Sequence, residues 1–315
     1  MINRRSFIVG IKSTKLLRKE KIFLKKFRPW GVILFTRNIR NIKQTYKLTL
    51  SIRKLFKDTN YPILVDQEGG RVNRLKNIIS FENFTSEFFG NIYKKNNKEF
   101  KFLYKLFIDK TSFLLKLMGI NINTVPVLDL RIKGSSSIIG DRSYSNKPKV
   151  VSKIGDFCIQ NFHENGIGTI IKHIPGHGNA KVDSHYFTPI IRKKKNYLMK
   201  NDFYAFKNKK SYFAMTAHLI FDKFDQNNTV THSKKMIRII RNAINFKNIL
   251  ISDDLSMQSL SKDLKQNTIR AFNAGCNLVL HCNGNLKEME IIGKNSPLIN
   301  KFLAKKTSQF YKILS

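Results

Sequence analysis

The chain has 315 residues, 42% of them hydrophobic, which is enough to build a buried core and excludes a disordered protein. Its 58 Lys and Arg residues against 21 Asp and Glu residues give a formal net charge of +37, which is typical of proteins that bind nucleic acid or anionic surfaces. The basic residues are spread along the chain, however, and only residues 192–195 form a run of four. A biased base composition of the gene accounts for this pattern as well as a functional use of the charge does.

The chain contains three cysteines, Cys158, Cys276 and Cys282. An odd number, with two of them in apolar runs, argues against a disulfide framework and indicates a reducing compartment. The first apolar stretch, residues 7–11, is too short for a signal peptide, and no apolar run reaches membrane-spanning length. We therefore expect a cytoplasmic protein with no membrane partner.

Eight short apolar runs, rich in β-branched residues, are predicted to be strands. In chain order they are residues 7–11, 31–35, 62–66, 122–128, 168–172, 212–218, 248–252 and 276–281. Stretches with the spaced apolar residues of amphipathic helices lie between them, at residues 44–56, 100–118, 150–165, 234–245 and 264–274. Three of these stretches are followed by a glycine where a helix would end, at Gly119, Gly166 and Gly275.

The strands are continuously apolar rather than alternating, which is typical of parallel strands covered by helices. Eight such strands alternating with helices predict an α/β fold of the (β/α)₈ TIM-barrel type, as a single domain over residues 1–315. Residues from about 284 to 315 would form a helical tail, too short for a further domain. A doubly wound open sheet is the rival architecture, because spacing alone does not separate the two.

Titratable residues gather where the predicted strands end, which in a barrel is the face that carries the active site. Scattered polar residues would not choose the same end of so many strands, so this distribution indicates an enzyme. The residues are Asp66, Asp129, Asp141, Arg142, Lys172, His173, His218, Asp253, Asp254 and His281.

Residues 65–75, VDQEGGRVNRL, place two acids, a glycine pair and two arginines after the third strand. Arg71 and Arg74 can donate paired hydrogen bonds to oxygen acceptors. No GxGxxG or GxxxxGK[ST] pattern occurs in the chain, so a nucleotide loop is not predicted. For Glu68 and Arg71, the alternative is an Asp/Glu–Arg network that only fixes the turn. Arg142, in a Gly- and Ser-rich loop, could equally contact a ligand or solvent.

Residues 172–185, KHIPGHGNAKVDSH, hold three of the seven histidines directly after the fifth strand. His173 and His177 are four residues apart, but Pro175 between them excludes the helix that would bring such a pair onto one face, and we predict no metal site. Asp183 beside His185 can fix the tautomer and orientation of the imidazole, as acid–base catalysis requires. A solvated basic surface loop is the alternative.

Residues 249–257, ILISDDLSM, bring two carboxylates out of the seventh strand. Neighbouring side chains on a strand point opposite ways, so only one of Asp253 and Asp254 can face the mouth of a barrel. The other is expected to bond backbone N–H groups or cap the next helix. A carboxylate nucleophile with a separate proton donor is the arrangement that glycoside hydrolysis uses.

Taken together, these segments resemble the family 3 glycoside hydrolases, and more closely the single-domain bacterial β-N-acetylglucosaminidases (β-hexosaminidases) of peptidoglycan recycling, the NagZ type. The segments that carry the resemblance are GVILFTRN, VDQEGGRVNRL, VPVLD, IGDRSYS, KHIPGHGNAKVDSH and ISDDLSM, in this order. The resemblance runs from about residue 7 to residue 282, is poor over residues 81–97, and implies a (β/α)₈ barrel.

The resemblance also implies roles for individual residues. Asp253 corresponds to the nucleophile that forms a glycosyl-enzyme intermediate, and His185, held by Asp183, corresponds to the acid/base. The positions that bind the N-acetylglucosamine unit correspond to Asp66, Arg74, Arg142, Lys172 and His173.

The implied reaction releases terminal N-acetylglucosamine (GlcNAc) from GlcNAc-1,6-anhydro-N-acetylmuramic acid, with or without peptide, with retention of configuration. It needs no cofactor and no metal, and a monomer suffices. Two alternatives remain: a barrel hydrolase or phosphorylase acting on another β-linked sugar, and a basic nucleic-acid-binding protein. The dispersed lysines and the lack of a recognisable binding motif argue against nucleic acid as a partner.

Overall fold

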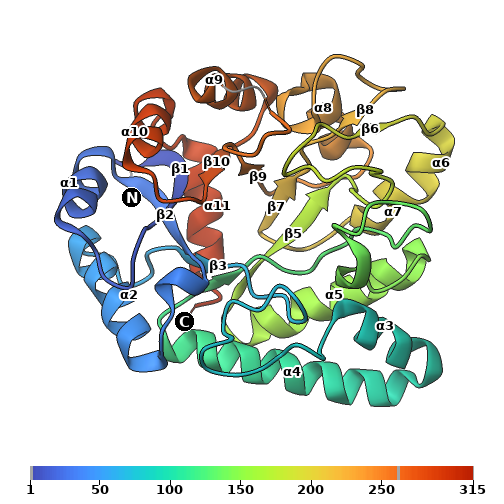
Figure 1. The fold of residues 1–315 in the computed structure, drawn as a ribbon, viewed down its shortest axis with the longest axis horizontal. Helices are drawn as coiled ribbons and strands as arrows, with labels where there is room; N and C mark the ends of the chain where they lie inside the picture. Colours follow the sequence, from blue (N-terminus) through green and yellow to red (C-terminus); the bar gives the residue numbers. More distant parts are fainter. Residues whose placement is uncertain (1–2, 261–262, 315) are drawn as a thin grey trace.

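The computed structural model describes residues 3–260 and 263–314, and it contains a closed barrel of eight parallel strands surrounded by helices (Figure 1). The strands follow one another around the barrel in chain order, with the last pairing with the first. They are β1 (Arg5–Gly10), β2 (Pro29–Leu34), β3 (Ile63–Val65), β4 (Ile122–Asn123), β5 (Gly168–Ile174), β7 (Phe213–Thr216), β9 (Ile249–Asp254) and β10 (Leu278–His281). The (β/α)₈ prediction is therefore confirmed, and the closed strand order excludes the doubly wound sheet.

The fourth strand is shorter than the sequence predicted. Regular pairing stops at Asn123, and beyond it Val127 makes only an isolated bridge to Lys172. Pro126 has no N–H to donate to a ladder. Its carbonyl still accepts from the Lys172 N–H at 3.1 Å, and the Leu128 N–H donates to the Lys172 carbonyl at 2.8 Å, so the segment stays beside β5 without forming a regular strand. A second pair, β6 (Ile190–Ile191) and β8 (Ile220–Phe221), forms a small parallel ribbon outside the barrel that the sequence did not predict.

The five predicted helices are present within a few residues of the expected bounds, as α2 (Ile42–Phe56), α4 (Asn97–Leu117), α5 (Pro148–Glu164), α8 (Lys234–Asn242) and α9 (Leu264–Ala274). The glycines that follow three of them have positive φ, as at Gly275, where φ is 118°. Four further helices, not among the examples named from the sequence, are α1 (Arg18–Phe27), α3 (Ser86–Lys95), α6 (Lys195–Lys200) and α7 (Asp202–Phe206). Residues 284–315 contain α10 (Leu286–Asn295) and α11 (Lys301–Tyr311). No helix in the described part of the chain is long and apolar enough to cross a membrane.

Two apolar clusters divide the core, and the side-chain alternation of the strands assigns residues to them. Ile249 and Ile251 of β9 lie in the cluster inside the barrel, whereas Leu250 lies in the larger cluster between the barrel and the helices. On β10, Leu278 and Leu280 likewise point inward and Val279 outward. The next inward side chains are Asp253 and Cys282, which is how polar groups reach the mouth of the barrel.

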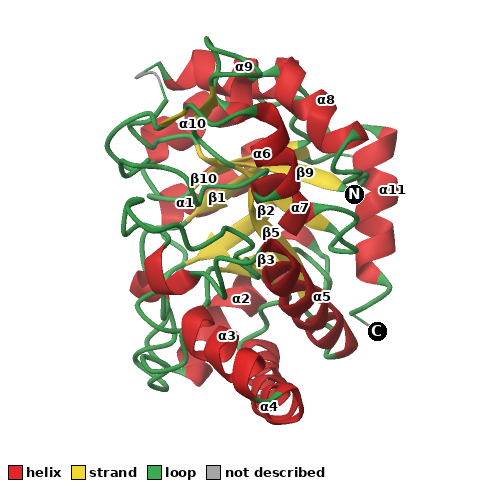
Figure 2. Ribbon diagram, turned by 90° about the vertical axis from the view of Figure 1, so that its right-hand side faces the viewer, coloured by secondary structure: helices red, strands yellow, loops and turns green. Residues whose placement is uncertain are grey.

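Helix α11 covers the amino-terminal end of the barrel. Trp30 donates a 2.9 Å hydrogen bond from Nε1 to the Thr307 hydroxyl, and the rings of Phe213 and Phe310 pack edge to face with centroids 5.2 Å apart. Figure 2 shows α11 on the opposite side of the strands from most of the long loops. Among the described residues, α11 thus closes this end and leaves the carboxyl ends of the strands as the open end of the barrel.

Candidate active site

A cavity of about 270 Å³ opens at the carboxyl ends of the strands. This is just below the roughly 300–1,000 Å³ range of small-molecule sites, so it suits a single sugar ring better than an oligomer. Seven of the eight predicted site residues line it: Asp66, Arg74, Arg142, Lys172, His173, His185 and Asp253. The eighth, Asp183, does not line the cavity and reaches it through a hydrogen bond to His185.

Asp66 follows β3 and is the acceptor for two cations. One carboxylate oxygen accepts from Lys172 Nζ and the other from Arg74 Nη2 at 2.8 Å. Burial alone would raise the pKa of Asp66, but Lys172 and Arg74 outweigh it and hold that pKa well below its usual value. The carboxylate therefore stays ionised, and it presents fixed acceptors to hydroxyl groups of a ligand.

Glu68, which does not line the cavity, forms ion pairs with Arg142 and Lys172, which do. Its two carboxylate oxygens accept from Nη2 and Nε of Arg142, both at 2.8 Å, and Lys172 Nζ lies 2.6 Å from Oε1. The carboxylate is almost wholly buried. Its partners lie outside residues 65–75, so the network orients two cavity-lining cations and does not merely fix the turn. Arg71, by contrast, pairs with Asp141 at 3.0 Å, at the rim of the cavity.

Asp253 is the last inward-facing residue of β9. Its Oδ1 accepts from the backbone N–H of Asp254 at 2.8 Å, and its Oδ2 lies 4.0 Å from His173 Nε2. Burial opposes ionisation, but the imidazole of His173 and the Asp254 N–H lower the pKa of Asp253. The side chain of Asp254 instead accepts from the backbone N–H and the hydroxyl of Ser256, at 3.0 and 2.8 Å, so one cavity-facing carboxylate stands at the strand end.

Asp129, which is fully buried, organises the start of the 172–185 loop. It accepts from Nδ1 of His173 at 2.7 Å and from the backbone N–H of His177 at 2.7 Å. Because Nδ1 of His173 points to this carboxylate, Nε2 is the nitrogen that faces the cavity and Asp253. The sequence placed Asp129 at a strand end but did not predict this role.

His177 and Ser184 tie the two ends of the same loop together. His177 Nε2 lies 3.0 Å from the Ser184 hydroxyl, and its Nδ1 is buried without a partner among the described residues. Burial, and then the nearby His173, lower the pKa of His177 to about 4, so the ring is neutral at physiological pH. A neutral ring carries one proton, and the Ser184 hydroxyl can either accept from Nε2 or donate to it.

His185 stands at the rim of the cavity, with a little over half of its side chain exposed. Both its Nδ1 and its backbone N–H donate to Oδ1 of Asp183 at 2.8 Å. This pair of bonds holds the ring so that Nε2 is the free nitrogen, which is the geometry that a proton donor and acceptor needs. The backbone carbonyl of His185 accepts from Gln258 in the loop after β9 at 3.2 Å.

Apolar side chains complete the cavity. Phe35 after β2 forms one wall, where the guanidinium of Arg74 stands 5.4 Å from its ring centroid, and Met215 and Leu280 line the cavity below. A cavity that combines ionic hydrogen-bonding groups with apolar walls matches a sugar, whose hydroxyls and C–H faces require both.

Two residues at strand ends do not join the site. His281 points away from the cavity, is fully buried, and lies 2.7 Å from Glu288 of α10 through Nε2. His218 is also buried and donates from Nε2 to the Asp254 carbonyl at 3.1 Å, so it supports the turn behind the strand end.

Residues 8–300 match the model of the glycosyl hydrolase family 3 N terminal domain. Two relatives, each called beta-hexosaminidase, come from Idiomarina loihiensis (30% identical, covering 92% of this chain and 87% of the relative) and Nitrosomonas eutropha (32% identical, covering 88% and 80%). Among solved structures, NagZ from Neisseria gonorrhoeae in complex with N-trifluoroacetyl-D-glucosamine superposes with a TM-score of 0.86 at 28% identity, covering 98% of this chain and 90% of that one.

Proposed function

The chain belongs to glycosyl hydrolase family 3 and is a β-N-acetylhexosaminidase, and we propose that it removes the non-reducing terminal GlcNAc from GlcNAc-1,6-anhydro-N-acetylmuramic acid, with or without peptide, in peptidoglycan recycling. The Neisseria relative was solved with an N-acylated glucosamine, which supports GlcNAc as the sugar in the cavity. In this proposal the protein works in the cytoplasm as a monomer.

Asp253 is the nucleophile of this proposal. Its carboxylate is ionised, faces the cavity and has one oxygen engaged by the Asp254 N–H, which leaves the other for attack on the anomeric carbon. The bond from that oxygen to the anomeric carbon forms as the bond to the aglycone oxygen breaks. Displacement of the resulting ester by water restores the original configuration.

His185 supplies and removes the proton. As an imidazolium it protonates the departing aglycone oxygen, and the neutral ring then takes a proton from the water that attacks the ester. Asp183 stabilises the imidazolium and holds its orientation through the bond to Nδ1. The position of His185 at the rim suits this work, because the aglycone leaves and water enters on that side.

The remaining groups hold the sugar. Asp66 accepts from hydroxyls, whereas Arg142, Lys172 and His173 donate, and Glu68 keeps the two cations in place. These groups are already oriented by their hydrogen-bond partners before a ligand arrives, which reduces the free-energy cost of organising the site during reaction.

One observation carries the proposal: an ionised carboxylate on β9 and an Asp-oriented histidine in the loop after β5 line one cavity of monosaccharide size. The first test follows nitrophenol release from 4-nitrophenyl β-N-acetylglucosaminide by the wild type and by Asp253→Ala, His185→Ala and Asp254→Ala. Asp254 is the matched control, because its carboxylate bonds Ser256 outside the cavity.

We expect Asp253→Ala to lose at least about 10³-fold in kcat and Asp254→Ala to remain within about tenfold of the wild type. His185→Ala should lose about 10²–10⁴-fold on the anhydro disaccharide and less on the nitrophenyl sugar, whose leaving group needs little protonation. Equal losses for Asp253→Ala and Asp254→Ala would refute the assignment of the nucleophile.

Substrate and stereochemistry need separate measurements. GlcNAc-1,6-anhydro-N-acetylmuramic acid should be cleaved with a higher kcat/KM than chitobiose, and the first product seen by proton NMR should be the β-anomer. A first product of α configuration would exclude retention. Formation of GlcNAc 1-phosphate in phosphate buffer would identify a phosphorylase instead.

A further inference from the structure

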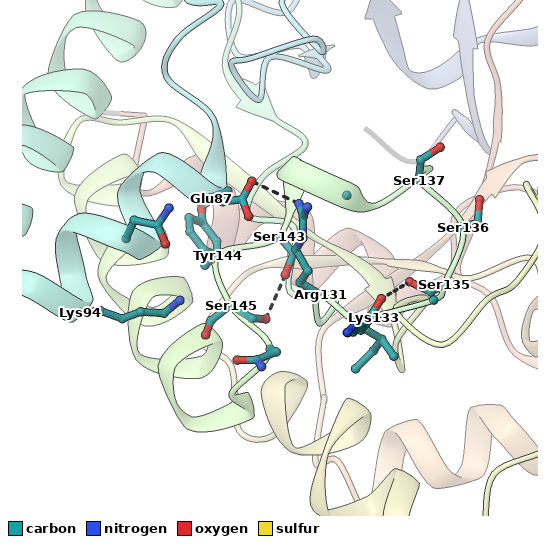
Figure 3. A pocket seen from close by; sticks show the side chains of 15 residues that line it. Glu87, Lys94, Arg131, Lys133, Ser135, Ser136, Ser137, Ser143, Tyr144 and Ser145 are labelled. Carbon is teal, nitrogen blue, oxygen red and sulfur yellow. Dashed lines mark hydrogen bonds and ion pairs between the residues drawn. The ribbon is translucent and has the colours of Figure 1, made fainter.

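A second cavity, of about 550 Å³, lies between α3 and the segment from residue 131 to residue 146. One wall is a face of α3 that carries Glu87 and Lys94, spaced by two helical turns. The opposite wall is the loop after β4, with Arg131 and Lys133 (Figure 3). We call this space the α3 pocket.

The α3 pocket is cationic. Three of its lining side chains, those of Lys94, Arg131 and Lys133, are basic and one, that of Glu87, is acidic, so the lining carries three positive charges against one negative charge. Glu87 forms an ion pair with Arg131 at 3.2 Å. Within residues 3–260 and 263–314, neither Lys94 nor Lys133 has an ion-pair partner. The pocket therefore offers two ammonium groups that are free to receive an anion.

Its floor is polar and well ordered. Ser143, which is buried, donates from Oγ to the Asp129 carbonyl at 2.6 Å, and the Ser145 hydroxyl accepts from the backbone N–H of Lys147 at 3.2 Å. Figure 3 shows the side chain of Lys94 reaching from α3 toward Ser145. Ammonium groups above a hydroxyl-lined floor match the hydrogen-bonding needs of a carboxylate better than those of an apolar group.

A single stretch of chain separates the α3 pocket from the active-site cavity. Ser137 and Gly140 line the α3 pocket, whereas Ile138, Ile139 and Arg142 line the active-site cavity. This dividing segment is fixed from the active-site side, because Arg71 Nη2 donates to the carbonyls of residues 137 and 138 at 2.6 and 2.7 Å. A substituent that leaves the cavity over this segment meets the α3 pocket next.

We propose that the α3 pocket binds the carboxylate-bearing end of a peptide attached to the aglycone, with Lys94 and Lys133 as its anchors. The inference rests on the proposed function, since it assumes that the sugar occupies the first cavity. Two extended residues span about 7 Å, which is enough to cross one strand of backbone. The pocket would thus make the enzyme prefer aglycones with acidic peptides.

The test compares three substrates: 4-nitrophenyl β-N-acetylglucosaminide, GlcNAc-1,6-anhydro-N-acetylmuramic acid carrying an Ala-Glu dipeptide, and the same compound with both dipeptide carboxyls amidated. The variants are Lys94→Ala, Lys133→Ala, their combination, and Lys54→Ala. Lys54 lies on α2, is exposed and lines neither cavity, so it removes the same charge elsewhere. Arg131 is left intact because its removal would release Glu87.

We expect replacement of either pocket lysine by alanine to raise KM for the acidic substrate by about 2–5-fold, and replacement of both to raise it by about 5–20-fold, with kcat unchanged. The amidated and nitrophenyl substrates should be unaffected, and Lys54→Ala should match the wild type. An equal rise for Lys54→Ala would assign the effect to diffuse charge, and an equal rise for the amidated substrate would exclude carboxylate recognition. Either result would overturn the proposal.

Failure of the proposed function is distinguishable from failure of this inference. If the wild type released no nitrophenol, the proposed function would be refuted. Normal release, with identical KM values of all variants for the acidic substrate, would refute only the α3 pocket proposal. A fluorescein-labelled Ala-Glu dipeptide with free carboxyls, titrated by polarisation against the wild type and the double variant, tests the pocket without turnover. Equal binding by the two proteins would refute the proposal.

Discussion

The buried His177 makes the stability of the fold depend on pH in a way that can be isolated. Its folded pKa is about 4, lowered by burial and by His173, whereas an unfolded histidine titrates near 6.5. Between these two values the unfolded chain binds the proton and the folded chain does not. The free energy of unfolding must therefore fall as the pH drops through this window, and the stabilisation is complete only above about pH 6.5.

The size of the effect follows from the two pKa values. At pH 5 the unfolded imidazole is almost fully protonated and the folded one is mostly neutral, so this group lowers the unfolding free energy by about 2 kcal/mol. At pH 7 its contribution is about 0.2 kcal/mol. A residue that does not titrate at position 177 should therefore abolish this difference of about 2 kcal/mol in unfolding free energy between pH 7 and pH 5.

His177→Gln is the suitable variant. The glutamine amide can still donate to the Ser184 hydroxyl, which Nε2 contacts at 3.0 Å, but it does not titrate. Urea unfolding of the wild type and the variant at pH 7.0 and pH 5.0 gives four free energies. We expect the wild type to lose about 2 kcal/mol more than the variant on acidification.

Other groups do not disturb this comparison, because both proteins carry them. Asp202, for example, has its pKa raised by burial to about 6, so it stabilises the folded state at low pH and loses that contribution as the pH rises through 6. If the two proteins changed by the same amount between pH 7.0 and pH 5.0, the reasoning about His177 would be refuted. The proton would then be accommodated in the folded state.

Three further changes test other parts of the architecture. Asp129→Asn keeps one acceptor oxygen where two now serve His173 Nδ1 and the His177 N–H, so urea unfolding should show a loss of about 2 kcal/mol, and an unchanged midpoint would contradict this. Phe310→Ala opens a cavity at the closed end of the barrel and should cost about 3–5 kcal/mol by the same measurement, with the active site intact in any protein that stays folded. Gly90→Ala would bring a Cβ to 1.7 Å from the Tyr144 carbonyl oxygen, so we expect poor folding by circular dichroism, and a melting temperature equal to the wild type would show that α3 can shift.

Much of the fold could be predicted because strands and helices are encoded over short distances. The run at residues 249–254 has the apolar composition of a covered parallel strand, and the 264–274 helix ends at a glycine that tolerates positive φ. Where prediction went too far, as at β4, regular pairing ends at Asn123, and only separate hydrogen bonds, such as that from the Leu128 N–H to the Lys172 carbonyl, continue beyond it.

Less of the candidate site could be predicted, because its contacts join distant parts of the chain. Glu68 meets Arg142, 74 positions later, and Lys172 reaches Asp66 across 106 positions. The sequence marked these residues as polar groups near strand ends. It held no sign that Glu68 lies behind the two cations, that Asp129 carries the histidine loop, or that His281 turns toward α10.

The sequence by itself determined the number of strands, their parallel arrangement and the end at which chemistry gathers, because these depend on composition and on a local period of two residues. It also determined that Asp253 and Asp254 point opposite ways. Only the tertiary structure decided which of them faces the cavity. A strand buried on both faces is apolar on both, so its sequence pattern does not show which face lies inside the barrel. Closure of the barrel places Asp253 on the inner face and His281 on the outer face.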